Sequence, residues 1–222
     1  MQKSFYFFCY VLICFFSYCS EDPLNTSNRI LINQDQLNSA FDSARNLGRV
    51  KCLLVSCQDT FYKAEFFLPG AETQTHDVMS VTKSVTSLLI GIAIDKGIIP
   101  SVDEPIDGYI RPIVNDLDSA KGRITIKQLL TMSCGLEWSE IPGPSEFMQW
   151  YTSPDKLLYI INKPFVSIPG ESFNYSDGAA HLASVVLSQA TNMTSNEFAQ
   201  HYLFSPLGIG DRVWTTDNRG FN

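Results

Sequence analysis

The chain has 222 residues, of which 45% are hydrophobic and 18% are charged, a composition typical of a globular protein with a buried core. Its net charge of −7 disfavours a nucleic-acid partner, because phosphate binding requires a basic face.

The N-terminal segment differs from the rest of the chain. Residues 5–18 are almost entirely apolar, follow the positive charge of Lys3 and end abruptly at Ser20. A bilayer span takes roughly 20 residues, so this order indicates an export signal over residues 1–19 and a protein that is periplasmic or held at the cell envelope. Cys19 resembles the lipidated cysteine of bacterial lipoproteins, although Tyr18 precedes it instead of a small residue. A plain cleaved signal and a lipid anchor at Cys19, the one membrane attachment we expect, both stay open.

Residues 20–44 are polar and predict a tether, followed by a single domain over residues 45–222. Two strand patterns, at 50–57 and 61–67, flank a short polar turn and predict a β-hairpin. Three cysteines follow the signal, an odd number at irregular spacing that argues against a disulfide framework, and no spacing predicts a metal site. We expect Cys52, Cys57 and Cys134 to be small buried side chains, the first two on opposite strand faces.

Helices dominate after residue 80. The strongest pattern runs over 81–96 and ends at Gly97; it has almost no polar face, which predicts a buried helix with a close neighbour at Gly91. A loop is expected over 98–123. Further helices are predicted at 126–132, 154–162, 179–190 and 195–203, with Thr125 and Thr194 as caps. A hairpin followed by helices indicates an α+β fold, and the scarcity of strands after residue 70 predicts an incomplete sheet.

Ser80 and Lys83 form the first candidate site. A serine hydroxyl is a weak nucleophile until a neighbouring base takes its proton. A lysine three residues further along a helix lies one turn away on the same face, and burial favours its neutral form. A serine at a helix start also lies near free N–H groups and the positive end of the helix dipole, which stabilise an oxyanion.

The spacing by itself is weak, since Ser-x-x-Lys arises by chance about once in a chain of this size. A second copy, Ser153 to Lys156, serves as a control. Pro154 at the first helical position predicts that Ser153 is an N-cap, with its hydroxyl bonded to the backbone.

The residues around Ser80 carry a family resemblance. Residues 79–84, Met-Ser-Val-Thr-Lys-Ser, resemble the first motif of the serine β-lactamase and penicillin-binding protein family. Three further stretches are similar to class-C-like members in the expected order, at 124–136, 169–177 and 204–209. The likeness spans roughly residues 45–222. It implies a β-lactamase/transpeptidase-like α+β fold and a hydrolase that needs no cofactor.

The resemblance also implies roles for single residues. Ser80 would be acylated by an amide or ester substrate, Lys83 would help to deprotonate it, and Tyr175 would be the second basic group. Asp177 stands where asparagine is commonest and is a candidate substrate-binding residue. As an ionised carboxylate it only accepts hydrogen bonds, and pairing with Lys83 would hold that lysine charged and make it a poorer base.

Other groups receive structural roles. His76 and His181 are candidates for a Ser-His-Asp triad, but the chain has no Gly-x-Ser-x-Gly elbow, so we expect both to be structural. Trp138 and Trp150 are expected in the core rather than in a substrate cleft.

The family's third motif, Lys-Thr-Gly or a variant with histidine, has no match after Tyr175. We therefore expect a chain truncated before that motif, with the last sheet strands missing. The substrate class is a small molecule or peptide with an amide or ester bond: a β-lactam, a D-amino-acid peptide, an ester or an amide oligomer. The alternative is a non-catalytic ligand-binding pseudoenzyme at the envelope, or an inactive fragment.

Overall fold

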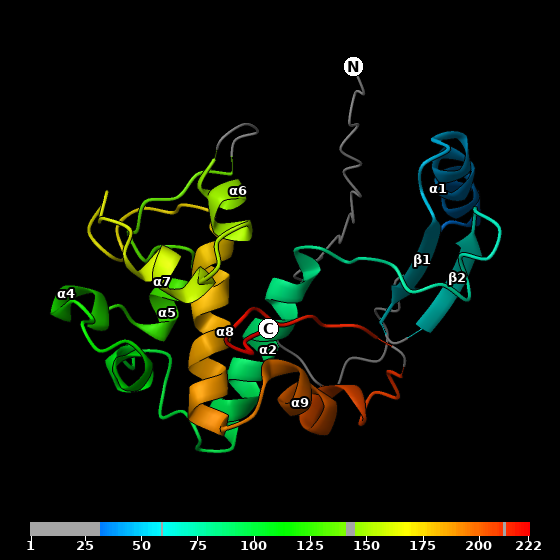
Figure 1. Ribbon diagram of the computed structural model, residues 1–222. Coiled ribbons are helices and arrows are strands. Elements are labelled where there is room, and N and C mark those ends of the chain that lie inside the picture. The colour runs from blue at the N-terminus through cyan, green and yellow to red at the C-terminus, as the bar shows by residue number, and fades with distance from the viewer. Residues whose placement is uncertain (1–31, 59, 141–144, 211) are drawn as a thin grey trace. The chain divides into compact units, whose positions relative to one another are not determined.

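The computed structural model describes residues 32–58, 60–140, 145–210 and 212–222 (Figure 1). The expected export signal and Cys19 lie outside the described residues. The chain divides into two compact units, Met1–Met79 and Ser80–Asn222, so the domain expected over 45–222 includes the last part of the first unit and all of the second. Each unit is described by itself. No helix in the described ranges has the length and apolarity needed to cross a membrane.

The first unit contains the expected β-hairpin. Strand β1 (Cys52–Cys57) pairs antiparallel with β2 (Thr60–Phe66), which places Cys52 opposite Phe66. These are the strands of the one sheet in the part of the chain that the structure describes. The prediction that all three cysteines are buried is wrong in part. Cys134 is buried, but Cys57 is only half-buried and Cys52 is exposed, because alternation along β1 turns the Cys52 side chain outward.

Helix α1 (Gln34–Asn46) corrects the expected tether, whose second part is helical. Asn33 caps α1 by accepting hydrogen bonds from two backbone N–H groups of its first turn. Leu37, Phe41 and Ala44 recur at helical spacing and are buried, a period that the polar composition of the segment conceals. Phe41 is fully buried, and its ring centroid lies 6.4 Å from that of Phe67, which follows β2.

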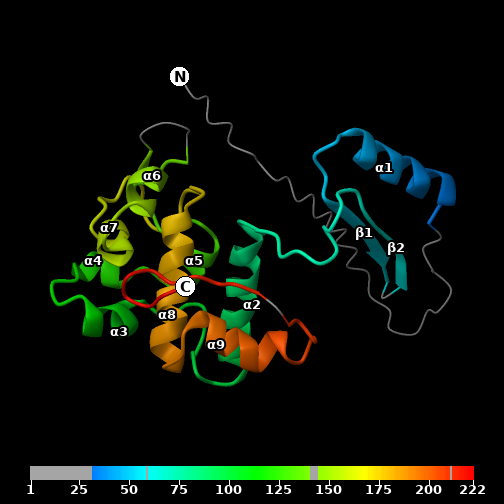
Figure 2. The ribbon, with the colours of Figure 1, turned by 45° about the vertical axis from the view of Figure 1, so that its right-hand side comes forward.

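The second unit is helical and is built around α8 (Asp177–Thr191), which lies between α2 (Val81–Asp95) and α7 (Lys156–Ile161) in both views (Figures 1 and 2). Ten residues of α8 are buried, from Gly178 to Ser188. The remaining elements of the unit are α3 (Asp107–Ile110), η1 (Arg111–Ile113), α4 (Ser119–Gly122), α5 (Ile126–Leu130), α6 (Glu146–Tyr151), α9 (Ser195–Ala199) and the π-helical turn η2 (Gln200–Phe204).

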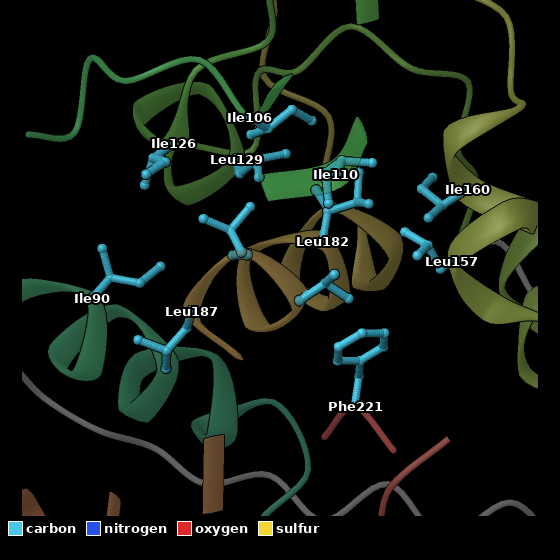
Figure 3. Close-up of a cluster of buried hydrophobic side chains, with 14 of the residues drawn as sticks. Ile90, Ile106, Ile110, Ile126, Leu129, Leu157, Ile160, Leu182, Leu187 and Phe221 are labelled. Atoms are coloured by element: carbon cyan, nitrogen blue, oxygen red, sulfur yellow. The ribbon is translucent and has the colours of Figure 1, made fainter. Parts of the chain in front are cut away.

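The core gathers around α8, where Leu182 and Leu187 point toward side chains from the surrounding elements (Figure 3). Each large apolar side chain removed from water contributes roughly 1.5–3 kcal/mol. This packing therefore fixes α8 and α2, which carry the candidate site. The other labelled contributors are Ile90, Ile106, Ile110, Ile126, Leu129, Leu157, Ile160 and Phe221.

Helix α2 begins and ends within one residue of the prediction, but it is not buried all round. Leu89, Ile90 and Ala93 are buried, whereas the Leu88 side chain is 57% exposed and a Cβ added at Gly91 would meet no atom within 4 Å. An apolar composition shows that a helix is able to be buried, but only the number of packing neighbours decides how much of its surface is covered.

Short helices account for the other differences. The loop expected over 98–123 contains α3, η1 and α4, and α6 was not expected. Helices of three to six residues are too short to show a period and owe their stability to tertiary packing. The cap of α7 was also misplaced: Asp155, not Ser153, accepts the hydrogen bond of the first turn, from the Leu158 N–H at 2.9 Å.

Candidate active site

Ser80 directly precedes α2, yet its side chain makes no cap hydrogen bond. The backbone has helical dihedral angles at this position, so the hydroxyl is turned away from the N–H groups that an N-cap serine normally engages. The hydroxyl is therefore available to other side chains, at the positive end of the dipole of a 15-residue helix.

Lys83 lies one turn along α2, and its Nζ donates a hydrogen bond to Ser80 Oγ at 3.0 Å. The same ammonium group forms an ion pair with the Asp177 carboxylate, the first residue of α8. The side chains of Lys83 and Asp177 are only 18% and 21% exposed. Two helices that are far apart in the sequence thus bring together the Ser80 hydroxyl, the Lys83 ammonium and a counter-charge.

Tyr175 completes the cluster. Its hydroxyl donates to Ser80 Oγ at 2.7 Å, and its ring centroid lies 5.0 Å from Lys83 Nζ. Tyr175 is 39% exposed, so a molecule arriving from solvent can reach the phenol. All four site residues named from the sequence, Ser80, Lys83, Tyr175 and Asp177, are therefore brought together in one unit.

The charge state of Lys83 follows from these contacts. Burial acts to lower the pKa of the Lys83 ammonium, but the hydrogen bond and charge of Asp177, with a smaller contribution from Tyr175, outweigh it and hold the pKa above its usual value. Lys83 is accordingly protonated at neutral pH. A protonated Lys83 is a poor base, as expected for a lysine that pairs with Asp177.

A scaffold of backbone and side-chain contacts holds Tyr175 and Asp177 in place. The Asn174 N–H donates to the Met132 carbonyl at 2.7 Å, and the Asn174 side-chain amide donates to the Trp138 carbonyl at 3.1 Å. On the other side of Asp177, Gly178 fits against Trp138 and Ile160: an added Cβ would lie 2.7 Å and 2.6 Å from their side chains.

Glu140 is a neighbour of the site that sequence reasoning missed. Its Oε1 accepts hydrogen bonds from the Trp138 indole N–H at 2.5 Å and from the Asp177 backbone N–H at 3.1 Å. Burial raises the pKa of the Glu140 carboxyl, and the nearby charge of Asp177 adds to the increase. Glu140 and Asp177 are 37 residues apart, so no local pattern could have connected them.

The second Ser-x-x-Lys copy has other partners. Ser153 Oγ accepts from the Asp155 N–H at 3.2 Å and donates to the Asp155 carbonyl at 3.1 Å, so its hydroxyl is bonded to the backbone as predicted. Lys156 Nζ lies over the rings of Trp150 and Tyr151, at 4.9 and 5.1 Å from their centroids. The same spacing thus serves different local structures at the two places.

The remaining candidates have structural surroundings. His181 is buried, and its Nε2 lies 3.1 Å from the Asp217 carboxylate. Its ring packs against Trp150, with the two ring centroids 5.6 Å apart. His76, in the first unit, contacts the Ala71 carbonyl at 3.1 Å. Trp138 and Trp150 are buried, which confirms the prediction that they belong to the core.

An N-terminal hairpin, a bundle around α8 and a serine–lysine pair at the start of α2 define the class of β-lactamase/transpeptidase-like folds. The family comparison agrees with this class. A family model described as Beta-lactamase matches residues 69–222, and the chain belongs to this family.

Single relatives share parts of the chain. Beta-lactamase-like protein 2 of Dictyostelium discoideum is 26% identical over 136 residues, which are 60% of this chain and 25% of that protein. A Bacillus anthracis protein, provisionally assigned as a 6-aminohexanoate-dimer hydrolase, is 18% identical with a TM-score of 0.67, over 83% of this chain and 50% of that one. EstCE1, a hydrolase with promiscuous acyltransferase activity, is also 18% identical, with a TM-score of 0.63, over 85% of this chain and 55% of its own. The chain thus spans a quarter of the curated relative and about half of each solved structure.

Proposed function

We propose that this chain carries the acylating residues of a serine hydrolase that cleaves an amide or ester bond through an acyl-enzyme on Ser80. The observation that supports the proposal is that Ser80 Oγ accepts hydrogen bonds from both Lys83, at 3.0 Å, and Tyr175, at 2.7 Å. The names of two structural relatives, a provisionally assigned 6-aminohexanoate-dimer hydrolase and a hydrolase with promiscuous acyltransferase activity, are compatible with the same kind of chemistry.

The contacts of Lys83 divide the roles between the two bases. Because Asp177 keeps Lys83 charged, Tyr175 is the better proton acceptor once its own proton has left. The Lys83 ammonium, 5.0 Å from the phenol ring, stabilises the resulting phenolate by Coulomb attraction.

Acylation of Ser80 then combines proton transfer through Tyr175 with attack on the substrate carbonyl. The Tyr175 hydroxyl, which donates to Ser80 in the resting site, first loses its proton to solvent water. The resulting phenolate takes the proton of the Ser80 hydroxyl while Oγ forms a bond to the substrate carbonyl carbon, whose π electrons move to the carbonyl oxygen and then return. The bond from that carbon to nitrogen or oxygen breaks, and Tyr175 returns the proton to the leaving group. Water repeats the sequence: it gives a proton to the phenolate, its oxygen attacks the ester, and the Ser80 oxygen leaves and recovers the proton.

Covalent labelling tests the nucleophile. We expect a fluorophosphonate probe to modify the chain, and mass spectrometry to place the adduct on the peptide that contains Ser80. Ser80→Ala should lose the label, whereas Ser153→Ala, in the other Ser-x-x-Lys copy, and Ser84→Ala, one turn further along α2, should keep it. Undiminished labelling of Ser80→Ala would reject the assignment.

A pseudoenzyme that binds ligands without turnover is the second candidate function, because the ion pair with Asp177 weakens Lys83 as a base. Release of product from a chromogenic ester distinguishes the two. Steady turnover that Lys83→Ala abolishes supports the hydrolase, whereas stable binding that is indifferent to Lys83→Ala supports the pseudoenzyme.

We also propose that the protein acts at the cell envelope, from the apolar run at 5–18 and the polar boundary after it. Cell fractionation tests this location. Incorporation of labelled fatty acid that is lost in Cys19→Ser would support a lipid anchor, and processing without incorporation would support a plain signal.

A further inference from the structure

The N-terminal turn of α8 is held by two side chains of different origin. Ser176, the N-cap, accepts from the Ala179 N–H at 3.0 Å, which is an ordinary local cap. The N–H group of Asp177, two residues before Ala179, donates instead to Glu140, a residue from the segment that follows α5. A cap from elsewhere in the chain does more than satisfy a free N–H group, because it fixes the position of the turn relative to that segment.

Glu140 is itself held. The Trp138 indole N–H donates to the same oxygen that accepts from Asp177, and Trp138 is 6% exposed and packed in the core. Trp138 also touches the turn directly, since its ring lines the space beside Gly178 and its carbonyl accepts from the Asn174 amide. Glu140 thus connects a buried core side chain to the backbone N–H of the residue that pairs with Lys83.

We propose that Glu140 is a positioning residue, which holds the first turn of α8 so that the Asp177 carboxylate is directed at Lys83. The inference rests on the proposed function, because it assigns to Glu140 an effect on Ser80 that passes through Asp177 and Lys83. Its carboxylate also sits near the positive end of the α8 dipole, and a purely electrostatic effect of that kind is the competing explanation.

Three variants separate these explanations. Glu140→Gln keeps an oxygen that accepts from both N–H groups but removes the charge, and Glu140→Ala removes both. Glu137→Gln is the matched control: it lies three residues away, and its carboxylate faces Lys163 at 3.7 Å instead of α8. Two readouts on the full chain are used, the titration of the Lys83 amine by nitrogen-15 NMR and the rate at which a fluorophosphonate labels Ser80.

For Glu140→Ala we expect a Lys83 pKa below that of the unmodified chain and a labelling rate about 10- to 100-fold lower, because Asp177 is no longer directed at the amine. Glu140→Gln should label within about fivefold of the unmodified chain, since the hydrogen bonds persist. Glu137→Gln should change neither readout. If Glu140→Ala proves unfolded by circular dichroism, Trp138→Phe, which removes the indole donor and keeps an aromatic ring, replaces it and should reduce the rate in the same direction.

Two results would overturn the proposal: an Ala variant that leaves both readouts unchanged, or a Gln variant as impaired as the Ala variant, which would assign the effect to charge. Absence of any label on Ser80 in all chains would reject the proposed function instead. The NMR titration would then still report whether Glu140 controls the contact between Asp177 and Lys83.

Discussion

Lys83 in the first turn of α2 and Asp177 at the start of α8 form an ion pair, and the same Lys83 ammonium donates to Ser80 Oγ. The pair joins the two long helices of the second unit at their N-terminal ends. A residue type that departs from the commonest family pattern, aspartate in place of asparagine, therefore sets the charge beside Ser80.

Replacing Asp177 by asparagine should change the pH dependence of labelling. The raised pKa of Lys83 lies above its ordinary value of 10.5, so Lys83 stays charged throughout the neutral range. Without the carboxylate, burial dominates and the pKa falls. We expect the alkaline limb of the rate profile for Asp177→Asn to move to lower pH, measured with a fluorophosphonate at constant ionic strength.

Asp177→Asn should also change the pH dependence of stability, in a direction that follows from the raised pKa of Lys83. A raised folded-state pKa means that the ion pair stabilises the fold fully below pH 10.5 and that this contribution disappears as the pH rises through the higher folded value. Asp177→Asn should therefore lower the unfolding midpoint across the neutral range, and the difference from the unmodified chain should shrink only in strong alkali. In the labelling experiment, a higher rate for Asp177→Asn than for the unmodified chain at neutral pH would contradict the proposed roles and identify neutral Lys83 as the base.

Tyr175→Phe should slow labelling by about 10²- to 10⁴-fold, the usual contribution of a general acid or base. The change removes the hydroxyl that donates to Ser80 and leaves the ring, so the unfolding midpoint should hardly move. Tyr202→Phe is the control, because Tyr202 is similarly exposed, 37% against 39%, and packs beside Lys96. Equal rates for the two variants would exclude Tyr175 from proton transfer.

Two glycines provide a steric test of the scaffold. A Cβ at Gly178 would lie 2.6 Å from Ile160 and 2.7 Å from Trp138, whereas a Cβ at Gly91 meets nothing within 4 Å. Gly178→Ala should destabilise the protein by about 1–3 kcal/mol, the usual effect of overpacking. Gly91→Ala in α2 should stabilise it by up to about 1 kcal/mol, because alanine is the better helix former. Chemical denaturation measures both changes, and equal midpoints would contradict the described packing.

Asp217→Asn should weaken the protein and reduce its sensitivity to acid. Burial acts to raise the pKa of Asp217, but contact with His181 and the N–H groups of Phe221 and Arg219 hold it below its ordinary value of 3.8. A lowered pKa stabilises the fold above pH 3.8, and this contribution is lost as the pH falls through the lower folded value.

We expect Asp217→Asn to lower the free energy of unfolding by about 1–3 kcal/mol at neutral pH. Below pH 3.8 the variant should lose less stability than the unmodified chain, and thermal unfolding at a series of pH values measures both effects. Asp103→Asn serves as the control, since that side chain is 73% exposed and lies 4.0 Å from Lys127. A neutral midpoint equal to that of the unmodified chain would show that the contact between His181 and Asp217 contributes nothing.

The pattern of residues along the chain was sufficient to predict those helices, strands and caps that depend on neighbouring residues alone. The hairpin was predicted from two apolar, strand-forming runs on either side of a short polar turn. The bounds of α2 and α8 were predicted to within two residues, because each element follows from side chains that are close along the chain. The caps Thr125 and Thr194 were recognised for the same reason, and both form capping boxes. Helix α1 was missed because its apolar stripe is narrow, and α6 because six residues are too few to show a period.

The sequence alone determined which residue types are present for the chemistry: Ser80 and Lys83 one turn apart, and a tyrosine and an aspartate in one short later segment. Tertiary structure alone decided the charge of Lys83, the orientation of the Ser80 hydroxyl and the part played by Glu140. These depend on contacts across 37 to 95 residues, between Asp177 and Glu140 and between Tyr175 and Ser80. Electrostatic and hydrogen-bond energies depend on distance in space, and spacing along the chain fixes that distance only within a single helix or strand.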